Sequence, residues 1–177
     1  MNPVMIDPGH GGRDPGATAF GLSEKDLNLA IALELARALE ELKIPARLTR
    51  GRDLFRSLGQ RCELANNSFA SAFISVHCNA SANPGARGCE LFYMPGCKDG
   101  LLLAEQLRRG LSGLGRRDRG VSAADFYVLR HAAMPACLVE CGFLTNPGES
   151  AWLKGHAREI AQALAAGAAG YLGEDQA

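Results

Sequence analysis

Short apolar runs of strand length alternate along this chain with longer segments of helical period, and this alternation most narrows its possible folds. Because strands joined by helices give such an order, it favours an α/β layer fold. The length of 177 residues suits one domain and is too short for two. We therefore predict a single domain over residues 1–177, with about six strands in a mixed, mostly parallel sheet flanked by helices.

The predicted strands are short and mostly apolar, and they are PVMID (3–7), ARLT (46–49), AFISVH (72–77), GCELFYM (88–94), FYVLR (126–130) and ACLVEC (136–141). The first predicted helix begins after Ser23, an N-cap residue with Asp26 three positions later, and carries an apolar stripe as far as Leu42. A second helix is expected over 54–69 with Leu58, Cys62 and Ala65 facing inward, a third over 99–114, and an Ala-rich one within 152–172.

Composition argues against several classes of partner. Basic and acidic residues number 19 each, so no excess positive charge is available for nucleic acid or anionic lipid. Charged or polar residues and glycine interrupt every apolar run before it reaches the length of a membrane span. The cysteines are scattered without a C-x-x-C motif, and we expect reduced core thiols at Cys62, Cys78, Cys89, Cys97, Cys137 and Cys141. We also expect a monomer.

Polar side chains follow three of the predicted strands. His10 stands in the glycine-rich turn DPGHGG after the first strand, His77 ends AFISVH, and Glu140 lies near the end of ACLVEC. Because ligands of open α/β sheets bind beyond the carboxyl ends of the strands, we expect these three side chains to converge. Two imidazoles and one carboxylate form a standard catalytic zinc shell that leaves a position for water.

His10 and His77 are the two candidate imidazoles, and the acidic ligand remains open among Asp7, Asp14, Glu24 and Glu140. Structural roles compete for most of these acids. Asp7 and Asp14 suit turns, where Asp bonds nearby amides, and Glu24 suits the first turn of a helix. Glu140 is harder to explain structurally, because a carboxylate inside an apolar strand is costly to bury without a partner.

Four segments carry a resemblance to a known family, and they are DPGHGGRDPGA (7–17), SEKDLNLAIALELARALE (23–40), SVHCNAS (75–81) and FYVLR with MPACLVECGFLTNP (126–147). Together they resemble the zinc-dependent N-acetylmuramoyl-L-alanine amidases of the Amidase_3 type, in the family's order and over essentially the whole chain. The resemblance implies a zinc-hydrolase/phosphorylase-like fold. It also implies zinc held by His10, Glu24 and His77, and Glu140 as the catalytic acid/base.

The implied substrate is bacterial peptidoglycan, cut at the amide between N-acetylmuramic acid and the L-alanine of the stem peptide. Asn79 or Asp7 is the candidate to orient a ligand imidazole. Cys78 and Cys141 depart from the family's usual residues without touching the implied roles.

Three rival functions remain to be separated. A cysteine peptidase would pair Cys78 with His77, but adjacent strand residues point to opposite faces. A non-catalytic peptidoglycan-binding module or another zinc peptidoglycan peptidase is the further alternative.

We expect action at the cell wall, in the periplasm or outside the cell. The N-terminus shows no secretion signal, which predicts either a phage endolysin, cytoplasmic until lysis, or a domain of a larger exported autolysin.

Overall fold

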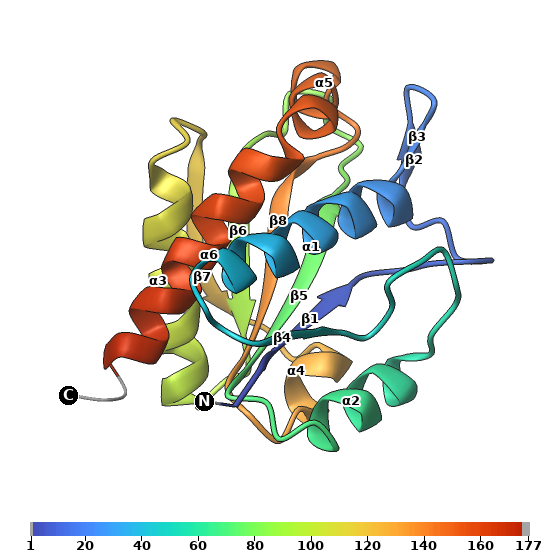
Figure 1. Cartoon of the computed structure of the whole chain (residues 1–177). Coiled ribbons are helices and arrows are strands. Elements are labelled where there is room, and N and C mark those ends of the chain that lie inside the picture. The colour runs from blue at the N-terminus through green and yellow to red at the C-terminus, as the bar shows by residue number, and fades with distance from the viewer. Residues whose placement is uncertain (1, 175–177) are drawn as a thin grey trace.

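The computed structural model describes residues 2–174 and contains a six-stranded sheet in the order β4-β1-β5-β8-β6-β7 (Figure 1). The strand bounds are β1 Val4–Pro8, β4 Ala46–Leu48, β5 Ala72–Asn79, β6 Cys89–Tyr93, β7 Asp118–Ala123 and β8 Ala136–Phe143. Strands β4, β1, β5 and β8 run parallel, and β6 pairs antiparallel with β8 and parallel with β7. The predicted single α/β domain with a mixed, mostly parallel sheet is confirmed.

Helices cover both faces of the sheet. Helices α1 (Glu24–Glu41), α3 (Lys98–Ser112) and α6 (Ala157–Glu174) pack together on one face, and α2 (Leu58–Asn66) and α4 (Tyr127–His131) lie on the other (Figure 1). A hairpin of β2 (Thr18–Ala19) and β3 (Leu22–Ser23) precedes α1, and α5 (Pro147–Gly155) precedes α6. No helix within residues 2–174 is long and apolar enough to cross a membrane.

Strand periodicity divides the core between the two faces. Val4, Ile6 and Ile74 point toward α1, α3 and α6, whereas Met5 and Phe73 point toward α2 and α4. All of them are buried, because a strand covered on both sides must be apolar at every position. This explains why the central strands read as continuous apolar runs.

Two of the predicted elements are wrong. FYVLR is the short helix α4, in which Phe126 and Tyr127 are exposed and Val128 and Leu129 are buried; two exposed residues followed by two buried ones follow a helical period. The sixth strand is instead β7, whose sequence DRGVSA is mostly exposed at the sheet edge and carries no apolar signal.

Three helix predictions need correction in detail. Helix α2 is shorter than 54–69, and its Leu58 is exposed although Cys62 and Ala65 are buried as expected. The closing segment 152–172 contains the end of α5 as well as most of α6. Ser23 is the N-cap residue of α1, but its hydroxyl donates to the Asp26 carboxylate (2.5 Å) and caps no backbone N–H.

A buried ion pair joins the sheet to α2 beneath the DPGHGG turn. Asp7 at the end of β1 accepts from Arg61 Nη1 at 2.7 Å, from Thr49 Oγ1 at 2.5 Å and from Ser75 Oγ at 2.9 Å. Arg61 also donates to the carbonyl oxygens of Pro8 (2.7 Å) and His10 (2.6 Å). Both charged groups are almost fully buried, so each depends on the other for its partner.

Removing one member of this pair is expected to destabilise the fold. Asp7→Ala leaves the Arg61 guanidinium buried without its carboxylate, and we expect the free energy of unfolding to fall by about 3–5 kcal/mol in urea denaturation. Glu34→Ala, which removes the more exposed ion pair with Arg37, is the control and is expected to cost less than about 1 kcal/mol. A similarly small loss for Asp7→Ala would contradict this role.

All six cysteines are free thiols, as predicted, and all but Cys97 are buried. Burial raises the pKa of Cys62, Cys78, Cys137 and Cys141, and raises that of Cys89 to about 12. Cys78 lies in the core between the sheet and its helices, on the face of β5 away from the cavity described below. It is therefore unsuited to act as a nucleophile.

The thiols should differ sharply in reactivity. In the folded protein we expect Cys97 to react with a disulfide reagent such as DTNB, and the five buried thiols to react only after denaturation. Timed thiol counts with and without guanidinium measure this difference. Rapid labelling of Cys78 in the folded state would contradict the burial argument and revive the cysteine-peptidase alternative.

Candidate active site

Three neighbouring parallel strands deliver His10, His77 and Glu140 to one edge of the sheet. β1 leads into the turn that holds His10, β5 carries His77, and β8 carries Glu140, which is the register partner of His77. The convergence predicted from the strand ends is therefore observed.

Glu24 joins the two histidines in one cluster. Its Oε2 lies 3.1 Å from His10 Nε2 and its Oε1 lies 2.9 Å from His77 Nδ1. One ligand atom from each of the three residues lies within 4.8 Å of the others, and the imidazole rings meet edge to face. Two imidazoles and a carboxylate at this spacing fit the protein ligands of one divalent metal ion with an open position.

Backbone groups fix both oxygens of the Glu24 carboxylate. Ala17 N donates to Oε2 at 2.9 Å, and Cys78 N donates to Oε1 at 3.2 Å. The Asn28 amide, one turn along α1, also donates to Oε1 at 3.3 Å. The first position of a helix thus contributes far more than a favourable interaction with the helix dipole, because its side chain is aimed at the two histidines.

The charges of the cluster are strongly coupled. The hydrogen bond with Glu24 raises the pKa of His10 to about 9, against the opposing effect of burial. Burial alone would raise the pKa of Glu24, but hydrogen bonds with His10 and His77 lower it below its usual range. A cation at this position is therefore favoured, whether it is a proton on His10 or a metal ion.

Asp14 orients His10, a role that the sequence assigned to the wrong residues. Asp14 Oδ2 lies 2.9 Å from His10 Nδ1, which leaves Nε2 facing Glu24. Asn79 instead accepts from Ala80 N, and Asp7 is held in the ion pair with Arg61. The available signal was the spacing of four residues in HGGRD, because this turn brings residues 11 and 14 together as a β-bridge.

Two glycines give the cluster its close packing. A Cβ on Gly9 would lie 2.2 Å from Cε1 of His77, so only glycine lets the His10 turn pass over that ring. Gly16 has φ +64°, and a Cβ there would lie 2.5 Å from Glu24 Oε2 and 2.7 Å from His10 Cδ2. The glycine-rich sequence around His10 is thus required by the packing of the three polar side chains.

Glu140 faces the same site but stays outside the cluster. Its Oε2 is buried and has no hydrogen-bond partner among residues 2–174. Burial raises the pKa of Glu140 to about 7, the value at which a carboxylate can both accept and release a proton near neutral pH. Such a group is expected in a catalytic site, since a purely structural carboxylate would be paired.

A cavity of about 480 Å³ opens beside these residues, a volume typical of ligand sites. His10, His77 and Glu140 line its inner side. Its outer walls come from the start of α2 and the loop before it, and from α4; their lining residues are Phe55, Arg56, Ser57, Leu58, Phe126, Tyr127 and Val128. The cavity is therefore continuous from the polar cluster to an apolar rim.

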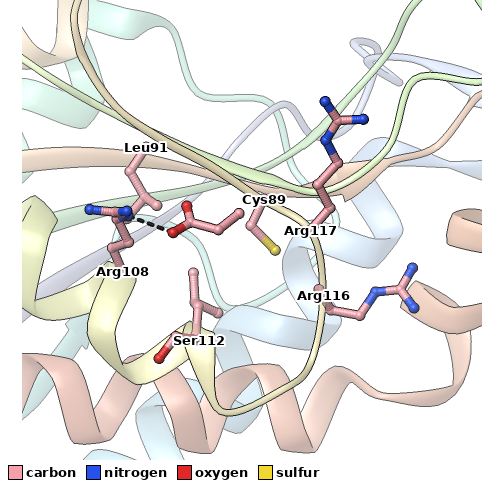
Figure 2. A pocket seen from close by; sticks show the side chains of 8 residues that line it. Cys89, Leu91, Arg108, Ser112, Arg116 and Arg117 are labelled. Carbon is pink, nitrogen blue, oxygen red and sulfur yellow. Dashed lines mark hydrogen bonds and ion pairs between the residues drawn. The ribbon is translucent and has the colours of Figure 1, made fainter.

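A second hollow lies far from this site, between β6, β7 and α3, and Figure 2 shows its side chains. Arg108 Nε donates to Asp118 Oδ2 across it at 2.7 Å. Its volume is about 10 Å³, the space of a single water molecule. It has no room for a substrate.

A parallel sheet that collects two histidines and two glutamates at one edge of an open cavity is the arrangement of a metal-dependent α/β hydrolase. Residues 4–169 match the family described as N-acetylmuramoyl-L-alanine amidase, Amidase_3, and the chain belongs to this family.

Known relatives agree with this membership. The amidase LytC of Bacillus subtilis strain 168 is 40% identical over 154 residues, which cover 85% of this chain and 31% of that protein. The endolysin of Bacillus phage SPP1 is 37% identical over 179 residues, which cover 91% of this chain and 65% of that protein. This chain thus spans less than two thirds of either protein. A solved amidase from Clostridium difficile 630 is similar at a TM-score of 0.93 and 40% identity, over 97% of each chain.

The three-residue cluster predicts a specific pattern of metal binding. His10→Ala and His77→Ala should each weaken binding of one divalent ion by more than the about 100-fold seen when a supporting residue is lost, because a direct ligand is removed. Metal content after dialysis and competition with a chromogenic chelator measure this affinity.

His156→Ala is the matched control, since His156 stacks on Trp152 on the helical side of the molecule. Unchanged affinity in both cluster variants would show that these residues do not hold the ion.

Proposed function

We propose that this chain is the catalytic domain, residues 1–177, of a zinc-dependent N-acetylmuramoyl-L-alanine amidase that cuts peptidoglycan between N-acetylmuramic acid and L-alanine. The observation that carries the proposal is the His10, Glu24 and His77 cluster sharing one cavity with the unpaired Glu140 carboxylate oxygen. Family membership and the names of the relatives support the bond and the polymer.

The proposed zinc ligands are His10, Glu24 and His77. When bound, zinc supplies a Lewis acid that polarises the amide carbonyl and makes water more acidic. Asp14 holds His10 with Nε2 toward the site, and the backbone donors on Glu24 keep its carboxylate in place. Imidazole, carboxylate and their supporting residues therefore form a preorganised site.

Glu140 is the proposed acid/base. Its buried Oε2 takes a proton from the attacking water and delivers it to the nitrogen of L-alanine as the amide bond breaks. The unpaired oxygen is ready for this transfer, since no protein donor has to be displaced first. General acid/base catalysis of this kind contributes typically about 10²–10⁴-fold to the rate.

We infer action at the cell wall, where this polymer lies, by a monomeric catalytic domain. The relatives include both a host amidase and a phage endolysin. The whole protein is therefore proposed to be a wall-lytic or wall-remodelling enzyme of either kind.

The first test is mass spectrometry of products released from purified sacculi, with chelator and with zinc restored. We expect zinc-dependent release of stem peptides that begin with a free L-alanine amine. Cut sugars or shortened peptides would indicate a different zinc hydrolase. No release under any condition would favour a non-catalytic peptidoglycan-binding module.

Glu140→Gln separates catalysis from metal binding. We expect turnover to fall by at least about 10²-fold while one zinc remains bound, because the proton carrier is lost and the ligands are intact. Glu159→Gln, on the exposed face of α6, should leave both turnover and zinc unchanged. Full activity of Glu140→Gln on sacculi would end the assignment of Glu140.

A further inference from the structure

The cavity beside the cluster contains a cation without a partner. Arg56 lines the cavity, its Nε is buried, and that atom has no hydrogen-bond partner among residues 2–174. Its guanidinium also makes no ion pair within the same residues, and its backbone carbonyl accepts from Arg61 Nε at 3.1 Å. An arginine held this way lacks the planar anionic partner that its donors match best.

The other arginine of the cavity wall is already used. Arg61 pairs with Asp7 and donates to the carbonyl oxygens of Pro8 and His10. It is nearly inaccessible and stabilises the protein itself. Arg56 is therefore the lining arginine, within the described chain, whose charge is left for a ligand.

The backbone around Arg56 is anchored to the His10 turn. Ser57 begins α2 with a capping box, in which its hydroxyl accepts from Gln60 N and the Gln60 side chain accepts from Ser57 N. On the other side, Asp53 accepts from Gly12 N at 2.7 Å and from Lys25 Nζ at 2.6 Å. The position of Arg56 relative to the cluster is thus set by contacts before and after it in the chain.

The remaining rim is apolar and is tied to α2. Leu58, Phe126 and Tyr127 are large apolar side chains left exposed at the cavity. Asn66 joins α2 to the end of α4, since its Nδ2 donates to His131 O at 3.0 Å and its Oδ1 accepts from Ala133 N at 2.8 Å. A fixed cation beside an apolar wall suits a ligand that carries both carboxylate and aliphatic groups.

We propose that Arg56 is a specificity-determining residue that binds a carboxylate of the stem peptide, so that this part of the cavity takes the peptide side of the scissile amide. The inference rests on the proposed amidase function. The two halves of that substrate differ in charge: the lactyl carboxyl of the sugar half is consumed in the amide bond, whereas acidic residues leave free carboxylates on the peptide half. A guanidinium therefore distinguishes the peptide half from the sugar half.

The test compares two soluble muramyl peptides of the same sequence, one with all peptide carboxyls free and one with all of them amidated. Zinc-loaded wild-type enzyme should prefer the free form in kcat/KM by about 10- to 100-fold, mainly through KM, as expected for a hydrogen bond to a charged group. In Arg56→Gln that ratio should fall to about one, and Arg56→Lys should restore part of it.

Arg130→Gln is the matched control, because Arg130 pairs with Asp125 on the exposed side of α4 and does not line the cavity. It should keep the wild-type ratio. The ratio is insensitive to partial loss of folded enzyme, since both substrates meet the same preparation. An unchanged ratio in Arg56→Gln would overturn the proposal.

Direct binding separates this inference from the amidase assignment. Calorimetric titration of zinc-loaded protein with the free and amidated stem peptides needs no turnover, and the free form should bind about 10-fold more tightly or better in wild type. Loss of that difference in Arg56→Gln supports the site even if neither muramyl peptide is cut, in which case the proposed reaction alone fails. Equal binding of both peptides to wild type would overturn the role of Arg56.

Discussion

The buried ion pair between Arg61 and Asp7 is the interaction on which the geometry of this site depends. Asp7 ends β1 and bonds to Thr49 and Ser75 on either side of it, while Arg61 reaches from α2 to the carbonyl of His10. The sheet, the His10 turn and α2 are thereby held as one unit. Because two desolvated charges tolerate little displacement, the pair fixes both the metal-binding side of the cavity and its α2 wall.

Glu24 plays the corresponding part at the centre of the site. Its carboxylate receives two backbone donors and approaches both histidines, although it lies far from His77 in sequence. Glu140 is a contrasting carboxylate, buried yet without a partner on one oxygen. This difference in hydrogen bonding lowers the pKa of one acid and raises that of the other, as expected if one carboxylate stays charged and the other carries protons.

Prediction from sequence succeeded where burial leaves a clear pattern. The strands β1, β5 and β8 are apolar throughout because helices cover both of their faces, so their bounds were nearly correct. The edge strand β7 is mostly exposed and gave no such signal. FYVLR, which is equally consistent with either element over five residues, was assigned to the wrong one because packing against α2 decided it.

By itself the sequence determined the class of fold and the positions of His10, His77 and Glu140 at strand ends, since both follow from local apolar patterns and the rules of parallel sheets. Spacing alone left four acids as possible third ligands. Only the tertiary structure placed Glu24 between the histidines, Asp14 on His10, and Arg56 in the cavity without a partner. These are contacts between side chains on different elements, and they exist only after β1, β5, α1 and α2 have packed together.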